Sequence, residues 1–277
     1  MFDKVIENAI KNAEKNAKVK EDDYILDGIL YCGNCNTAKQ TRVNFLGKEK
    51  IVYCVCKCEQ EAIEREKQER KRQEKMDRIA KLRSSGIHDK NIRAWNFDNA
   101  DNSQSIAKAK RYYQKWQEMY EKNIGLLLFG NVGTGKTYFA ACIANALISD
   151  GIPVLMTNFS KILNDLTGFK EEDKNSYINS LNNYELLIID DLGVERQSEY
   201  ALEQVFNIID SRYKNGQPLI VTTNLSIEEL KNPKDMSYKR IYDRILEMTI
   251  PLKIDGVSRR EKLHKDKLEL AKELFAD

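Results

Sequence analysis

Five short apolar runs in the second half of the chain indicate buried β-strands. The runs are IGLLLF (124–129), PVLMT (153–157), ELLIID (185–190), PLIVTT (218–223) and TIPLKI (249–254). Segments with helical spacing lie between them: residues 138–148 are apolar nearly all round, and residues 202–213 carry one apolar stripe. Continuously apolar strands that alternate with helices are typical of a parallel sheet covered on both faces. The pattern therefore predicts an α/β fold around a five-stranded parallel sheet.

Helical patterns also occur outside this region. Residues 1–17 carry an apolar stripe that needs a partner surface, either the segment that follows or another protein. Residues 59–83 contain seven acidic and nine basic side chains, which predicts a solvated linker helix, although its basic excess could contact phosphate. Residues 260–275 predict a last amphipathic helix. The domains that we expect are a small N-terminal part (1–58), a charged linker helix (59–86) and an α/β domain (87–277).

Composition excludes several classes of protein. The 277 residues are 42% hydrophobic and 32% charged, and no run approaches the 18 apolar residues of a membrane span. The first residues interleave charged and apolar side chains and so lack the core of a signal peptide. We therefore expect a soluble, cytoplasmic protein with no membrane contact. The net charge of +2 neither requires nor excludes a nucleic-acid partner.

The segment after the first apolar run has the pattern G-x-x-x-x-G-K-T. Its residues are Gly130, Asn131, Val132, Gly133, Thr134, Gly135, Lys136 and Thr137. Glycines let backbone N–H groups curl around a phosphate, and the helix that follows adds its positive N-terminal end. Lys136 can neutralise the β- and γ-phosphates, and the Thr137 hydroxyl can bind Mg²⁺. The pattern predicts an ATP site, and the alternative is a glycine-rich turn without a ligand.

Two acids, Asp190 and Asp191, end the third apolar run. A pair of carboxylates at the end of a buried strand is costly to desolvate without a cation. We therefore expect Asp190 to hold Mg²⁺ and Asp191 to orient or deprotonate the attacking water. The alternative is that both acids merely cap a strand.

Five of the six cysteines fall between positions 32 and 58. Cys32 and Cys35 form a C-x-x-C pair, and three further cysteines follow at 54, 56 and 58. Tetrahedral zinc takes four thiolates, and too few residues here form a core unaided, so we expect a structural zinc ion. The expected ligands are Cys32, Cys35, Cys56 and Cys58. Whether Cys54 replaces Cys56 or Cys58 is open, and free buried thiols or an iron–sulfur cluster are alternatives.

Several segments together resemble a known family. The loop GNVGTGKT, the segment LLIIDDLG, Asn224 after the fourth run, and the arginines in KRIYDRI and GVSRR resemble those of the AAA+ ATPases. More closely, they resemble the DnaC/DnaI-type helicase loaders and the related IstB-type transposition helpers. The likeness covers about residues 87–275.

The resemblance implies roles for residues that no local pattern explains. Asn224 would be the sensor that contacts the γ-phosphate or the water. Arg244 would be the finger that enters a neighbouring subunit's site, with Arg240 as the competing candidate. Arg260, or else Arg259, would be the second sensor. Because most AAA+ enzymes have glutamate where this chain has Asp191, we expect slow, switch-like hydrolysis.

The resemblance also implies a function. It implies an ATP-dependent loader that delivers a hexameric DnaB-type replicative helicase onto single-stranded DNA during replication. In such a loader, a zinc-binding N-terminal module would engage the helicase, and the ATPase domains would self-associate. Lys170 and Lys174 beside Phe169 are candidates for contact with single-stranded DNA, or belong to a plain connector. The first alternative is an IstB-type ATPase that acts on duplex DNA with a transposase. A small-molecule kinase and a nucleotide-gated adaptor with negligible turnover are further alternatives.

Overall fold

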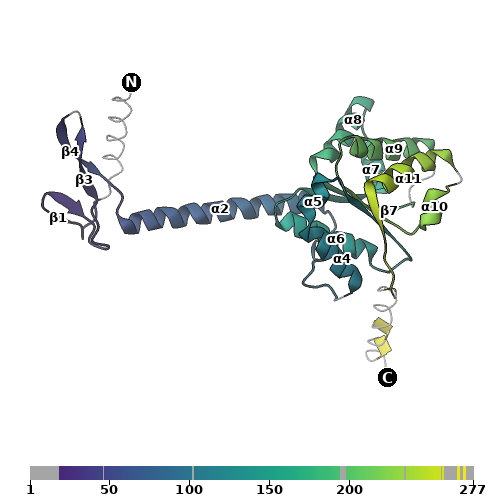
Figure 1. The fold of residues 1–277 in the computed structure, drawn as a ribbon, viewed down its shortest axis with the longest axis horizontal. Helices are drawn as coiled ribbons and strands as arrows, with labels where there is room; N and C mark the ends of the chain where they lie inside the picture. The colour runs from purple at the N-terminus through teal and green to yellow at the C-terminus, as the bar shows by residue number, and fades with distance from the viewer. Residues whose placement is uncertain are drawn as a thin grey trace. The chain divides into compact units, whose positions relative to one another are not determined.

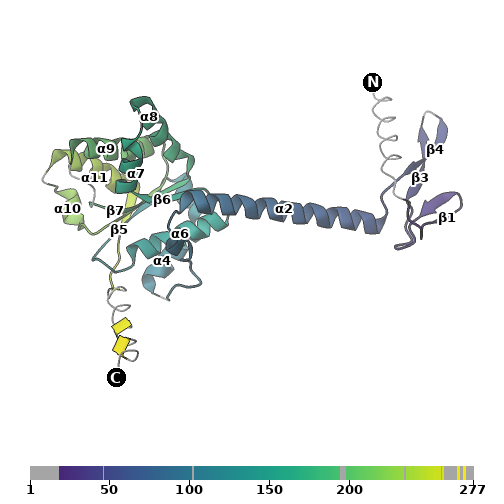
Figure 2. The same ribbon diagram turned by 180° about the vertical axis from the view of Figure 1, so that it is seen from behind.

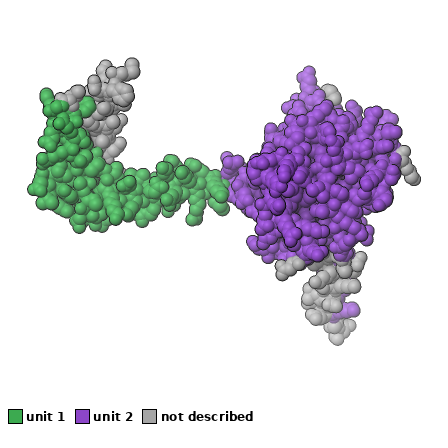
Figure 3. Space-filling view, in the orientation of Figure 1, with its two compact units in different colours: residues 1–76 green, residues 77–277 purple. Residues whose placement is uncertain are grey.

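The computed structural model describes residues 19–45, 47–101, 103–193, 198–233, 235–256, 258, 267–268 and 271–272. The chain divides into two compact units, Met1–Met76 and Asp77–Asp277, which are described separately (Figure 3). The helix expected over residues 1–17, and most of the one expected over 260–275, lie outside the described residues.

The first unit contains two antiparallel hairpins followed by a long helix. Its elements are β1 (Tyr24–Leu26), β2 (Ile29–Tyr31), β3 (Gln40–Phe45), β4 (Lys48–Tyr53) and α2 (Lys57–Gly86), which continues into the second unit. Asp27 and Gly28 link β1 to β2 with φ angles of 50° and 75°, as a two-residue hairpin turn requires. Residues 61–78 of α2 are exposed on all sides, so the expected charged helix is confirmed.

The second unit is an α/β domain. Its elements are α3 (Lys90–Arg93), α4 (Gln104–Gln114), α5 (Trp116–Glu121), β5 (Gly125–Phe129), α6 (Lys136–Ser149), β6 (Val154–Asn158), α7 (Phe159–Thr167), α8 (Glu171–Ser180), η1 (Leu181–Asn183), β7 (Leu186–Leu192), α9 (Glu199–Lys214), β8 (Leu219–Thr223), α10 (Ile227–Lys231), α11 (Met236–Met248) and β9 (Thr249–Lys253). The five strands form one parallel sheet in the order β6-β7-β8-β5-β9. This confirms the predicted sheet, and each strand begins and ends within two residues of its apolar run.

Helices cover both faces of this sheet (Figures 1 and 2). Leu126 and Leu128 of β5 pack with α4 and α6 on one face, whereas Leu127 packs with α7, α9 and α11 on the other. Successive strand side chains point to opposite faces, so a strand buried on both sides must be apolar at every position. That requirement is the reason why continuous apolar runs identified the strands.

A buried arginine joins α9 to the starts of two neighbouring strands. Arg212 has no exposed surface, and its guanidinium donates to the main-chain carbonyls of Tyr184 at 2.7 Å, Glu185 at 2.7 Å and Pro218 at 2.9 Å. It also donates to the side chain of Gln217 at 2.6 Å. Burial lowers the pKa of Arg212 to about 10, so the group is still protonated at neutral pH. One side chain therefore satisfies carbonyls that precede β7 and β8.

We predict that Arg212→Met lowers the free energy of unfolding by about 3 kcal/mol, because it leaves several buried carbonyls without donors. Urea unfolding followed by circular dichroism measures this loss. The matched control is Arg111→Met on the exposed face of α4, for which we expect a change within about 0.5 kcal/mol. Equal, small losses in both variants would contradict the role assigned to Arg212.

Candidate functional site

The glycine-rich loop connects β5 to α6, and its backbone explains its glycines. Gly133 and Gly135 have φ angles of 82° and 97°, in the left-handed region that side chains other than glycine rarely adopt. Gly135 is also the N-cap of α6, whose first hydrogen bond runs from the N–H of Phe139 to the Gly135 carbonyl. The first N–H groups of a helix have no partner within it, so this loop and helix start are suited to an anion.

Lys136 connects the loop to the end of a different strand. Its side chain is 5% exposed, and Nζ donates to the carbonyls of Gly130 at 2.9 Å and Asn131 at 2.8 Å. It also donates to Oδ1 of Asn224 at 2.7 Å. Asn224 directly follows β8, so two residues that are 88 positions apart in the chain meet at one edge of the sheet.

Asp190 lies at the same edge, in contact with the start of α6. Its Oδ1 accepts a hydrogen bond from the Thr137 hydroxyl at 3.0 Å. Burial raises the pKa of Asp190, and the neighbouring charge of Asp191 raises this pKa further. A cation would offset both effects, and a carboxylate with a hydroxyl is a donor set that Mg²⁺ accepts. The residues present therefore fit a bound magnesium nucleotide.

Asp191 is exposed and lies in a β-bulge that the sequence pattern did not predict. The register of β7 against β8 shifts between Ile189 and Leu192, and Asp191 has a φ of 57°. Aspartate tolerates this left-handed conformation better than most residues. Bulges are common beside active sites because they redirect a side chain. The signal available in the sequence is only that two polar residues interrupt an apolar strand before its last residue, Leu192.

A pocket beside the loop brings in residues that sequence reasoning missed. It is lined by Asp101, Ser103, Ser105, Ile106, Thr134, Gly135, Phe139, Ile254, Asp255, Gly256 and Ser258. Its apolar and hydroxyl-bearing side chains suit the nucleoside part of a nucleotide. No local pattern could have found it, because α4 begins 26 residues before the loop and its first turn has no motif of its own.

The two arginine-finger candidates lie on α11 and have no hydrogen bond or ion pair to the loop in the described part of the chain. Arg244 instead pairs with Asp210 of α9 at 2.8 Å, and its guanidinium lies 4.4 Å from the Phe206 ring centroid. Arg240 is exposed. Their roles in a neighbouring subunit's site stay predictions, and Arg259 and Arg260 lie outside the described residues.

The candidate DNA contacts lie around the start of α8. Phe169 is 41% exposed and its ring is 5.6 Å from that of Tyr177. Lys170 is the exposed N-cap residue of α8, and Nζ of Lys174 lies 5.1 Å from the Tyr200 ring centroid. The segment is thus helical and packed in part, and DNA contact by these lysines stays a prediction.

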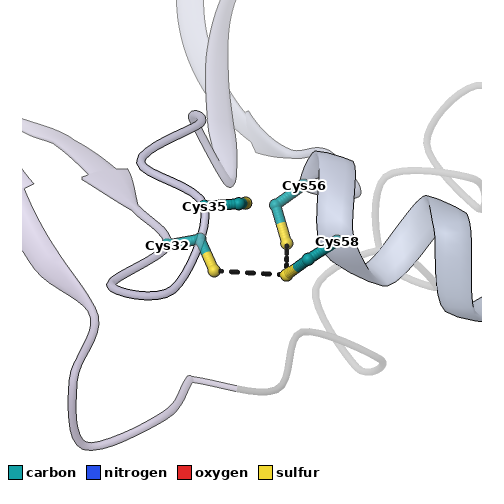
Figure 4. A group of neighbouring side chains, drawn as sticks. All are labelled: Cys32, Cys35, Cys56 and Cys58. Carbon is teal, nitrogen blue, oxygen red and sulfur yellow. Dashed lines mark hydrogen bonds between the residues drawn. The ribbon is translucent and has the colours of Figure 1, made fainter.

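Four cysteines of the first unit meet in one cluster (Figure 4). The sulfur atoms of Cys32, Cys35, Cys56 and Cys58 all lie within 4.8 Å of one another. The Cys58 sulfur is 3.6 Å from that of Cys32 and 3.4 Å from that of Cys56. Zinc–sulfur bonds of about 2.3 Å place tetrahedral sulfurs about 3.8 Å apart, so the donor set fits zinc. Cys54 instead directs its thiol to the Ala38 carbonyl at 3.4 Å.

The surroundings of the cluster lower the pKa of Cys35 and raise that of Cys56. Hydrogen bonds from the Thr37 hydroxyl and from the Cys58 backbone lower the pKa of Cys35 to about 5. Burial raises the pKa of Cys56 to about 12. Several thiolates this close together repel one another, so a cation is the partner that would stabilise all of them.

Backbone geometry explains the residues around the first cysteine pair. A Cβ at Gly33 would lie 1.9 Å from the Asp22 carbonyl oxygen, so only glycine fits. The buried carboxylate of Asp23 accepts from the Gly33 N–H at 3.3 Å and from Lys39 Nζ at 2.6 Å. This ion pair ties the turn between Cys32 and Cys35 to the rest of the module.

Among the helices that the structure describes, none combines the length and the apolar character that a membrane span requires.

Comparisons with known proteins agree with this geometry. The replicative helicase loader DnaC of Escherichia coli (strain K12) is 30% identical over 148 residues, which are 51% of this chain and 56% of DnaC. The replicative helicase loader DnaI of Bacillus subtilis (strain 168) is 25% identical over 150 residues, 50% of this chain and 48% of DnaI. The chain thus spans about half the length of the curated relatives it matches.

The fold comparison and the family comparison cover more of the chain. A crystal structure of DnaI superposes with a TM-score of 0.53 and 26% identity, covering 64% of this chain and 98% of that one. This likeness confirms the AAA+ fold that the sequence resemblance implied. The model of the IstB-like ATP binding protein family matches residues 34–267, from the cysteine cluster to beyond the last strand. The chain therefore belongs to the IstB-like ATP binding protein family.

Proposed function

We propose that this protein is an ATP-dependent loader that delivers a hexameric DnaB-type replicative helicase onto single-stranded DNA. The loader part is supported by relatives that are named replicative helicase loaders, at up to 30% identity. The ATPase part is carried by one observation: hydrogen bonds join three separate segments at one edge of the sheet. Lys136 donates to Asn224, and Thr137 donates to Asp190. A transposition helper is not favoured, because these relatives carry the name of helicase loaders.

The proposed chemistry follows from the residues at this edge. The loop N–H groups and Lys136 bind the phosphates. Thr137 and Asp190 would hold Mg²⁺, which would offset phosphate charge. Asn224 orients the γ-phosphate or the water, and Asp191 accepts the proton of the water. Arg244 or Arg240 from a neighbouring subunit, and Arg260 from the same chain, complete the site. Because this arrangement needs a neighbour, we propose self-association through the ATPase domains.

Asp191 can be tested without disturbing the bulge, because asparagine also tolerates a positive φ. We predict that Asp191→Asn lowers kcat for ATP hydrolysis at least tenfold and leaves ATP affinity unchanged, since general-base catalysis typically contributes about 100-fold or more. Asp191→Glu should raise kcat, because the longer side chain reaches closer to the water. Single-turnover measurements separate hydrolysis from binding. A native rate as high as that of motor ATPases would contradict slow, switch-like hydrolysis.

We further propose that a structural zinc ion is held by Cys32, Cys35, Cys56 and Cys58. These cysteines belong to a module (1–58) that we propose engages the helicase. The linker helix (59–86) connects this module to the ATPase domain (87–277). The support is the proximity of the four sulfurs. Zinc would bind as a closed four-thiolate site and contribute to the folding of this small unit.

We predict about one zinc ion per chain for the wild type. Cys56→Ser should lose the metal, because three thiolates bind zinc less tightly, whereas Cys54→Ser should keep it, because the Cys54 thiol is bonded to a carbonyl outside the cluster. Elemental analysis of the purified proteins measures how much zinc, and how much iron, each chain holds. Iron with inorganic sulfide would indicate a cluster instead, and four reactive thiols without metal would reject the site.

The loader function is tested with the DnaB-type helicase of the same organism. We predict that the wild type co-elutes with the helicase, and that it increases helicase loading on circular single-stranded DNA in the presence of ATP. Lys136→Ala should keep co-elution, which we assign to the first unit, and lose the ATP-dependent loading. Lys170→Ala with Lys174→Ala should weaken salt-sensitive binding to single strands if these lysines contact DNA.

The alternatives give different results in the same assays. Release of a phosphorylated metabolite would indicate a kinase. Loading that responds to ATP binding without hydrolysis would indicate a nucleotide-gated adaptor. Binding to duplex DNA and to a transposase, without any effect on a helicase, would indicate a transposition helper.

A further inference from the structure

The bulge in β7 places both aspartates opposite a single residue of β8. Ile189 pairs with Val221, and the next paired residues are Leu192 and Thr223. Asp190 and Asp191 therefore both lie opposite Thr222, with two residues of one strand facing one of its partner. In such a bulge the additional residue has no regular ladder partner for its N–H group.

The hydroxyl of Thr222 contacts both aspartates. It donates to Oδ1 of Asp190 at 2.6 Å and accepts from the backbone N–H of Asp191 at 2.9 Å. A threonine hydroxyl has one proton to donate and lone pairs to accept, so both bonds form at once. Thr222 is completely buried, and water therefore does not substitute for these bonds.

These bonds determine how the Asp190 carboxylate is held. Oδ1 accepts from two hydroxyls, those of Thr222 and Thr137, which fixes the rotation of the carboxylate. Among the residues that the structure describes, no donor reaches Oδ2, and this oxygen is left for a cation. The bond to the Asp191 N–H stabilises the left-handed backbone of that residue in the bulge.

We propose that Thr222 is a positioning residue of the nucleotide site: its hydroxyl orients the Asp190 carboxylate for Mg²⁺ and fixes the bulge that presents Asp191. Thr222 does not contact nucleotide in this role, and it acts through the two aspartates. The proposal rests on the ATPase function proposed above.

The test uses full-length Thr222→Val, which keeps the shape of the side chain, with Thr222→Ser, which keeps the hydroxyl. For the valine variant we expect about a tenfold higher Mg²⁺ concentration at half-maximal ATPase activity and about a tenfold lower kcat, as for other residues that orient metal ligands. Affinity for a fluorescent ATP analogue in EDTA should be unchanged. The serine variant should match the wild type within about twofold.

Thr249→Val is the matched control, because Thr249 is a buried strand threonine whose hydroxyl bonds to the Ile245 carbonyl and not to an aspartate. It should leave Mg²⁺ dependence and kcat unchanged. Thr222→Ala repeats the test without the branched side chain, and thermal melting identifies variants that do not fold. If neither the valine nor the alanine variant folds while the serine variant does, the hydroxyl is structural and the proposal is overturned.

Two results separate this proposal from the function on which it rests. A wild type that binds and hydrolyses ATP, with a Thr222→Val variant that has the same Mg²⁺ dependence and kcat, overturns the role of Thr222 alone. A wild type that binds no ATP overturns both.

Discussion

The contact between Asp190 and Thr137 is the one on which the proposed nucleotide site depends. It joins the carboxyl end of β7 to the first turn of α6, and no short segment of sequence could build it. A parallel sheet makes the contact possible, because all its strands end at the same edge and each is followed by a loop or a helix start. The helices that bury the two faces hold these ends in place. The fold therefore brings a carboxylate, a hydroxyl and an ammonium group together at one edge of the sheet.

Three buried basic side chains described above each have oxygen partners. Arg212 has carbonyl acceptors, Lys136 has three oxygens, and Lys39 has the Asp23 carboxylate. An unsatisfied buried polar group typically costs about 1–3 kcal/mol, which is a large fraction of the stability of a domain. The cysteine cluster lies in a unit of which few apolar side chains are buried among the residues that the structure describes. A metal ion there would add to the stability of this small unit.

The sequence predicted the parts of the structure that depend on local patterns. The strand positions followed from continuous apolar runs, and the phosphate loop followed from the spacing of Gly130, Gly135 and Lys136. The bulge at Asp191 was not predictable, because it depends on the register of β7 against another strand. The role of Arg212 was missed, since the carbonyls that surround it come from distant turns. The sequence also left Cys54, Cys56 and Cys58 as candidates for the second cysteine pair. Choosing among them requires knowing where the chain folds back on the first pair, which the local pattern does not give.

The contacts of Arg244 carry a consequence for assembly. Its guanidinium is already engaged by a carboxylate and an aromatic ring of the same chain. In the self-association proposed above, an Arg244 finger would serve an adjacent protomer only by giving up these partners, and the free energy of subunit pairing would then include a competition between the internal aspartate and the neighbour's triphosphate. The strength of the Asp210 pairing would in that case set how strongly nucleotide binding in one protomer is coupled to a rearrangement in the next.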